Sequence, residues 1–181
     1  KGYDKGDFTM VYGFPGRTQE YLSSYAVDMI MNDSDPLKVS LREKRLNIMN
    51  EDMLKSDAVR IAYASKYQSV ANYYKKWMGE MNGLKKYDAV AKKQLFEQQF
   101  NEAISSDPAK KEKYGNIFTQ LQKVYAEYKV LNKQVDYYSE CLMAIDAFSY
   151  ARFYVTLNNE LKKKQKGIAN TFDKTLEEYK K

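Results

Sequence analysis

Apolar residues recur every three or four positions along most of the chain, the spacing that places side chains on one face of an α-helix. We expect one helix to begin near Glu20 with Thr18 as its N-cap, and Asn32–Pro36 to form a loop after it. Further helices are expected over about 36–54, 57–78 after an N-cap at Ser56, and 84–104. The expected breaks between and after them are Gly79, Gly83 and the run Ser105–Pro108.

The clearest pattern is a heptad seam in the second half of the chain, which predicts left-handed coiled-coil packing. No Gly or Pro interrupts residues 116–165, so these residues form either one very long helix or two helices joined near Asp136. A last stripe follows Gly167 and consists of Ile168, Phe172, Leu176 and Tyr179. The seam itself consists of Tyr114, Ile117, Leu121, Val124, Tyr128, Leu131, Val135, Tyr138, Leu142 and Ile145.

The N-terminal segment follows a different pattern. Residues 7–13 place Phe8, Met10 and Tyr12 on one face, as a short β-strand does. The run ends at Gly13–Gly16, where a proline fixes φ and two glycines permit a sharp turn. The pattern predicts a mainly α protein: an elongated bundle of about five or six helices with a short N-terminal β-strand and turn.

Composition agrees with a folded helical chain of 181 residues that is 44% hydrophobic and 30% charged. The net charge is +6, but acidic and basic residues are mixed along the chain. The densest basic run, Lys162 to Lys166, follows Glu160, and we interpret it as a solvated helix face. We therefore expect no nucleic-acid partner.

The chain contains no histidine, which excludes Ser-His-Asp and Cys-His catalysis and histidine metal sites within it. The single cysteine, Cys141, excludes an internal disulfide and fits a small buried apolar position. No calcium loop, paired cysteines or phosphate-binding loop is present, so we expect neither a metal nor a cofactor. No stretch approaches the length of apolar residues that crosses a bilayer.

Two other clusters have simpler explanations than a binding site. Tyr74 and Trp77 share the apolar stripe of one helix, so we expect core packing rather than a stacking platform for bases. Glu43, Glu51 and Asp52 lie on helices rich in Lys and Arg, which favours surface charge pairs. From periodicity alone, the chain is a spectrin-like scaffold, an oligomerisation domain or a lid on another domain.

The N-terminal segment from Gly6 to Thr18 resembles the strand and turn of chymotrypsin-type peptidases. Together with later motifs, it resembles the bacterial dipeptidyl-peptidase 7 and 11 type, family 46 of the serine peptidases. The resemblance is strongest through about residue 115; Ala103 departs from it, since relatives are expected often to carry Trp there. The later motifs are Tyr21-Leu22, Ser56 to Ile61, Tyr63 to Tyr67, Asn72 to Lys75, Gly79, Gly83-Leu84 and Pro108 to Gly115.

The resemblance implies an enzyme that removes dipeptides from a free peptide N-terminus. Its fold would be a chymotrypsin-like barrel carrying a helical insert, with residues 1–18 belonging to the barrel and 19–181 to the insert. The catalytic triad would lie outside this chain, and the insert would cap the cleft and gate the access of peptide N-termini. The implied partners are a peptide substrate and the barrel, and the implied location is periplasmic, cell-surface or secreted. A homodimer is compatible with the resemblance.

The residues assigned to the junction between barrel and insert are Gly13, Pro15, Gly16, Arg17 and Thr18. We expect Arg17 and Thr18 to act as hinge or anchoring residues, with simple turn stabilisation as the alternative. The chain starts with Lys1 rather than Met and ends in a helical pattern at Lys181, so we expect a segment of a longer protein. The competing interpretation is a stand-alone helical scaffold or adaptor.

Overall fold

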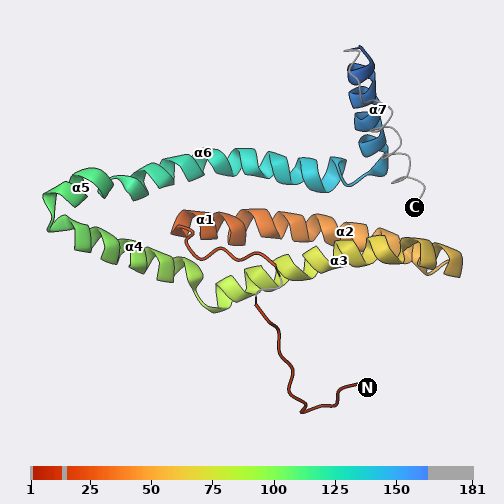
Figure 1. Ribbon diagram of the computed structural model, residues 1–181, viewed down its shortest axis with the longest axis horizontal. Helices are drawn as coiled ribbons and strands as arrows, with labels where there is room; N and C mark the ends of the chain where they lie inside the picture. The colour runs from red at the N-terminus through yellow and green to blue at the C-terminus, as the bar shows by residue number, and fades with distance from the viewer. Residues whose placement is uncertain (1, 14–15, 163–181) are drawn as a thin grey trace.

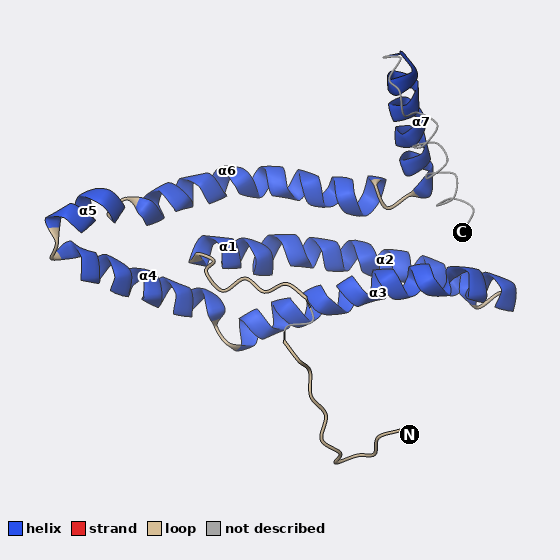
Figure 2. Ribbon diagram, in the orientation of Figure 1, coloured by secondary structure: helices blue, strands red, loops and turns tan. Residues whose placement is uncertain are grey.

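The first helical rod begins at α1 (Ser24–Met29), continues through the π-helical turn η1 (Ile30–Ser34) and ends with α2 (Asp35–Met53). The computed structural model describes residues 2–13 and 16–162, and the described chain is mainly helical, as predicted (Figure 2). The Ser23 hydroxyl caps α1 by accepting a hydrogen bond from the Ala26 N–H at 3.3 Å. The helix therefore starts later than predicted, and Ser23 rather than Thr18 is its N-cap.

The prediction of a loop at residues 32–36 is wrong, because the chain stays helical there. Pro36 has no N–H, and its ring crowds the carbonyl one turn earlier, which ordinarily ends or kinks a helix. Here the preceding turn is widened to π geometry, and the Asp35 N–H bonds to the Ile30 carbonyl. A π turn next to a proline relieves the clash without ending the helix. The rod passes through the proline as a result.

The second rod, α3 (Asp57–Lys86), follows a short turn and packs along α2, as Figure 1 shows. Buried Leu46 and Met49 of α2 meet Val70 and Ala71 of α3, and Tyr67 and Tyr74 pack against this cluster. The helix predicted over 36–54 and the packing of Tyr74 are thus confirmed.

The predicted end of α3 near Met78 is wrong. The helix continues through Gly79 and Gly83 to Lys86. Glycine in a helix interior costs only about 1 kcal/mol relative to alanine, which neighbouring turns offset. One such contribution is the pair between Lys76 Nζ and Glu80 Oε2 at 2.7 Å, one turn apart.

The next elements carry the chain past the start of α1 and then turn it back at α5 (Figure 1). α4 (Ala89–Ser105) starts after Asp88 and ends at the predicted break, where Asp107 caps α5 (Pro108–Tyr114) by accepting from two backbone N–H groups. Glu97 of α4 fixes the start of α1, because its carboxylate accepts hydrogen bonds from the Ser24 N–H (2.6 Å) and the Ser24 hydroxyl (2.7 Å).

The last described elements are α6 (Ile117–Tyr137), the π-helical turn η2 (Tyr138–Leu142) and α7 (Asp146–Lys162). The helical path bends at residues 143–145, so the two-helix alternative holds with its break later than Asp136. Figure 1 shows α6 running alongside α1 and α2, and α7 turning away from them. The predicted stripe from Ile168 to Tyr179 lies outside the described residues. No described helix has both the length and the hydropathy to span a membrane.

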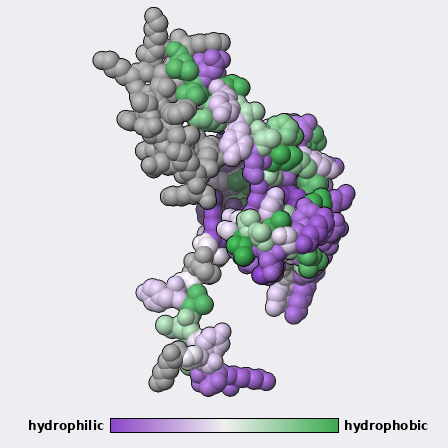
Figure 3. Space-filling view, turned by 90° about the vertical axis from the view of Figure 1, so that its right-hand side faces the viewer, coloured by the Kyte–Doolittle hydropathy of each residue, from purple (hydrophilic) through white to green (hydrophobic). Residues whose placement is uncertain are grey.

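The predicted heptad seam packs against the described chain only near its start, where Tyr114 contacts Phe100 of α4. Val124, Leu131 and Val135 remain 58–59% exposed, and hydrophobic side chains are visible among polar ones in the space-filling view (Figure 3). The side of α6 that faces the first rod instead carries Asp136, about a third of a turn away from the seam at 3.6 residues per turn, and η2 adds Glu140 on the same side.

The predicted β-strand over residues 7–13 is not formed in the described chain. Residues 8–12 have no helix or strand pairing, and Phe8, Met10 and Tyr12 are 72–96% exposed. A strand needs a neighbouring strand to pair its backbone N–H and carbonyl groups, and none of the described residues supplies one. The alternating pattern therefore lacks the sheet that would stabilise it.

Asp88 provides a stability test of the α3–α4 turn. It adopts φ +50°, a left-handed conformation that glycine adopts without the steric cost of a Cβ. We expect Asp88→Gly to raise the free energy of unfolding by up to about 1 kcal/mol, and Asp88→Val to lower it by at least as much. Urea unfolding followed by circular dichroism measures both. Equal stability of the glycine and valine variants would contradict the assigned backbone.

Candidate functional site

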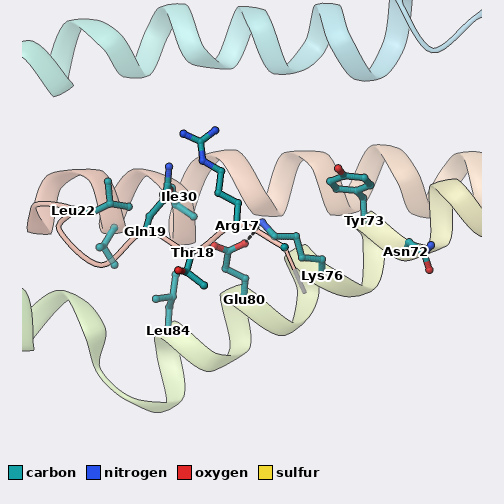
Figure 4. Close-up of a pocket in the computed structure, with 12 residues that line it drawn as sticks. Arg17, Thr18, Gln19, Leu22, Ile30, Asn72, Tyr73, Lys76, Glu80 and Leu84 are labelled. Carbon is teal, nitrogen blue, oxygen red and sulfur yellow. Dashed lines mark hydrogen bonds and ion pairs between the residues drawn. The ribbon is translucent and has the colours of Figure 1, made fainter. Parts of the chain in front are cut away.

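A groove of about 700 Å³ lies between the segment preceding α1 and the side of α3 (Figure 4). Its walls come from three places: Gly16–Gln19 and Leu22 of the segment, Val27 and Ile30 of the first rod, and one face of α3. The α3 residues are spaced by about one turn, which aligns them along the groove. They are Asn72, Tyr73, Lys76, Glu80 and Leu84.

The groove combines an apolar floor with a few polar groups, the usual make-up of a ligand-binding pocket. Val27, Ile30 and Leu84 supply apolar surface. Lys76 and Glu80 pair with each other at 2.7 Å while remaining partly exposed, so each keeps hydrogen-bonding capacity for a ligand. The groove is therefore suited to binding a molecule with both apolar and polar groups.

Three of the residues assigned to the junction line this groove. Gly16, Arg17 and Thr18 line its wall (Figure 4), and Gly13 adopts φ +78°, which a residue with a Cβ rarely does. Pro15 lies outside the described residues. Their role as a hinge or anchor stays a prediction.

An ion cluster, which we call the clamp, lies next to the groove and consists of buried Glu140 and the half-buried Arg42 and Arg45. The Arg42 guanidinium donates through Nε and Nη2 to the two carboxylate oxygens of Glu140 at 2.9 and 2.8 Å. Arg45 Nη1 donates to Glu140 Oε2 at 3.2 Å. The clamp joins α2 to η2, and the bidentate geometry fixes their relative position.

Arg42 also connects the clamp to α3. Its Nη1 donates to the Val70 carbonyl at 3.2 Å, and its guanidinium lies 4.6 Å from the Trp77 ring centroid and 5.2 Å from that of Tyr73. Lys38 lies over Trp77 as well, at 4.5 Å. Trp77 was predicted to be a core residue, but it is half-buried and its ring contacts two cations.

Asp35 is the most deeply buried charged residue described, with 1% of its surface exposed. Its Oδ1 pairs with Lys38 Nζ at 3.1 Å, while its Oδ2 has no hydrogen-bond partner among the described residues. Burial raises the pKa of this carboxyl, and nearby Glu80 adds to the rise; Lys38 and Lys76 oppose it. The helix continues through Asp35, so this residue does not lie at a free helix N-terminus. Free backbone N–H groups of a helix start are therefore not available to stabilise its buried carboxylate.

The described residues offer binding groups rather than catalytic ones. They contain no group of three potential metal ligands, and Cys141 is half-buried without a histidine anywhere in the chain to activate it. Asp52 pairs with Lys55 as a surface charge pair, as predicted. The fold is thus mainly helical, and the groove is its candidate binding site.

Sequence reasoning did not identify the clamp. Arg42 and Glu140 are 98 positions apart, and each by itself looks like an ordinary charged residue on an amphipathic helix. The only local signal was that Glu140 has no basic residue three or four positions away to pair with it on the helix.

The chain matches the family described as Peptidase S46 over residues 1–181 and belongs to that family. It is 44% identical to an Asp/Glu-specific dipeptidyl-peptidase of Flavobacterium psychrophilum over 78% of this chain and 20% of the relative. It is 39% identical to the Asp/Glu-specific dipeptidyl-peptidase of Capnocytophaga gingivalis over 95% of this chain and 25% of the relative. It is 36% identical to the dipeptidyl-peptidase 7 of Porphyromonas gingivalis over 84% of this chain and 22% of the relative. The chain thus spans a fifth to a quarter of the length of these relatives, and the family resemblance noted in the sequence is confirmed.

Asp35 predicts a pH dependence of stability. Because its folded pKa is raised above 3.8, the folded state binds the proton more tightly, and this carboxyl destabilises the fold progressively as the pH rises from 3.8 through the raised pKa. We expect Asp35→Asn to remove this pH-dependent destabilisation. The free energy of unfolding of the variant, relative to that of the wild type, should therefore increase between pH 3 and pH 7. Denaturant unfolding across that range measures it, with Asp4→Asn at an exposed position as the control. A difference independent of pH would contradict the prediction.

Proposed function

We propose that this chain is the helical cap of a serine dipeptidyl peptidase, which gates the access of peptide N-termini to the active-site cleft. Membership of the Peptidase S46 family and the names of the relatives support the reaction class. The match over residues 1–181 favours this proposal over a stand-alone scaffold or adaptor.

The observation that carries the proposal is the position of the groove. Its wall is formed by Gly16–Gln19, directly after the segment that resembles a strand of the peptidase barrel. A groove next to the point where the cap joins the barrel is well placed to face the cleft. Its apolar and polar lining suits a peptide, which presents both kinds of group.

The exposed apolar surface supports a role as part of a larger assembly. The described part buries only eight apolar residues, while seam residues such as Val124 and Leu131 stay exposed. Surfaces of this kind ordinarily pack against another protein surface. Under this proposal the barrel covers some of it, and the complete enzyme acts in the periplasm or at the cell surface, with a homodimer as its proposed assembly.

Such a cap supplies no nucleophile. Closing a lid positions the substrate and excludes water, while the reacting groups stay on the rigid catalytic domain. The triad of the proposed enzyme therefore lies outside these 181 residues, in keeping with the absence of histidine.

We expect the 181-residue chain by itself to release no dipeptide from a chromogenic dipeptidyl substrate, because it lacks the histidine that activates the serine in a Ser-His-Asp triad. The full-length enzyme, assayed under the same conditions, should be active and is the positive control. Turnover by the isolated chain that persists through repeated purification would contradict a purely covering role.

Filling the groove should weaken substrate binding in the full-length enzyme. Leu84→Trp adds an indole to the groove wall, and we expect KM for a dipeptidyl substrate to rise about tenfold, equivalent to about 1.4 kcal/mol, with kcat less affected. Leu95→Trp, the same change at an exposed position of α4, is the matched control. Identical kinetics of the two variants would show that the groove does not face the substrate.

A further inference from the structure

The second half of α6 and the turn η2 together form a segment, residues 129–142, that we call the distal arm. It lies along the first rod, on the side where η1 and α2 meet. Its side chains form hydrogen bonds and ion pairs with that rod. Lys129 Nζ pairs with Asp33 Oδ2 at 2.6 Å, the Ser34 hydroxyl donates to Asp136 Oδ2 at 2.6 Å, and Glu140 binds Arg42 and Arg45 in the clamp.

The two π turns supply these contacts reciprocally. η1 of the first rod provides Asp33 and Ser34 to the distal arm, and η2 of the distal arm provides Glu140 to α2. A π turn changes the direction of the side chains around it and is frequent at functional sites. Each helix thus carries a local irregularity that aims a polar group at the other.

The apolar core lies elsewhere. Leu46, Met49, Val70 and Ala71 join α2 to α3 and include no residue of the distal arm. The first half of α6 is held differently, since Phe118 contacts Phe100 of α4 edge-to-face at 5.7 Å. The apolar contacts thus hold the beginning of α6, while polar contacts hold its end.

This division makes the distal arm separable. When two polar groups separate, water takes the place of each partner, so the net loss of free energy is small. When two apolar surfaces separate, both are exposed to water and the hydrophobic stabilisation is lost. The apolar seam of the arm is already in solvent, because Leu131 and Val135 are 58–59% exposed. The bend at residues 143–145 follows directly, so the arm is not continued by a straight helix.

We propose that the distal arm docks on and releases from the first rod as one unit, pivoting at the first half of α6, and that Glu140 is the residue that holds it docked. This inference goes beyond the proposed gating of peptides, because it concerns motion within the helical chain. Releasing the arm frees a carboxylate and two guanidinium groups to solvent, which leaves no charge buried and unpaired in the open state.

Hydrogen exchange of the 181-residue chain, read at peptide resolution by mass spectrometry, tests the proposal without any substrate. In the wild type we expect the amides of 129–142 to exchange faster than those of the α2–α3 core around 46–49 and 70–71. Glu140→Gln keeps the size of the side chain and removes its charge. We expect it to accelerate exchange in 129–142 by about tenfold and to leave the α2–α3 core within about twofold.

The matched control is Glu127→Gln, the same change at an exposed position of the same helix, which should alter neither segment. Two results would overturn the proposal. One is equal exchange of 129–142 in the Glu127→Gln and Glu140→Gln variants. The other is a single cooperative opening of the arm and the α2–α3 core in the wild type, a measurement that does not depend on any variant folding. Either result leaves the proposed gating function untouched, since that is tested by kinetics of the full-length enzyme.

Discussion

The packing of the helices depends on a buried carboxylate that two arginines neutralise. Glu140 is 7% exposed, and a lone charge at that depth would be strongly unfavourable. Arg42 and Arg45 satisfy both of its oxygens, and this requirement fixes where η2 lies against α2. Replacing such a pair with apolar residues is often neutral for stability, so its main contribution is to specify one arrangement of the helices.

That specification matters because the apolar core is thin. The described chain buries eight apolar residues, four of them between α2 and α3, and long helices side by side slide easily when only a few side chains interlock. Directional contacts set the register instead. Ser24 with Glu97 fixes α1 on α4, and Ser34 with Asp136 fixes the first rod on α6. Both place a small hydroxyl against a carboxylate from a distant part of the chain.

The sequence predicted the helical class and most boundaries that depend on local chemistry. Ser56 precedes a helix start and Ser105–Pro108 lies at a helix end, and both were predicted from residue types that favour helix boundaries. It failed where distant contacts decide. The residues around Pro36 locally predict a loop, but a π turn lets the helix continue through the proline. The heptad seam predicts burial, but most of it is exposed in the described chain. The groove residues Arg17 and Thr18 were named for their position near the turn, whereas their proximity to α3 required the fold.

One side chain, Arg42, contacts both a residue that lines the groove and a residue of the distal arm. The Arg42 guanidinium lies against Tyr73, which lines the groove, and its fork holds Glu140 of the arm. A ligand that displaces the Tyr73 ring removes one of the surfaces that orient this guanidinium, and release of Glu140 removes another. Because Arg42 has a planar, rigid set of donors, it cannot rotate toward one partner and keep its geometry with the other. The contacts on the two sides of Arg42 therefore meet at one guanidinium, whereas a lysine at the same position could not donate to both Glu140 oxygens through a planar fork.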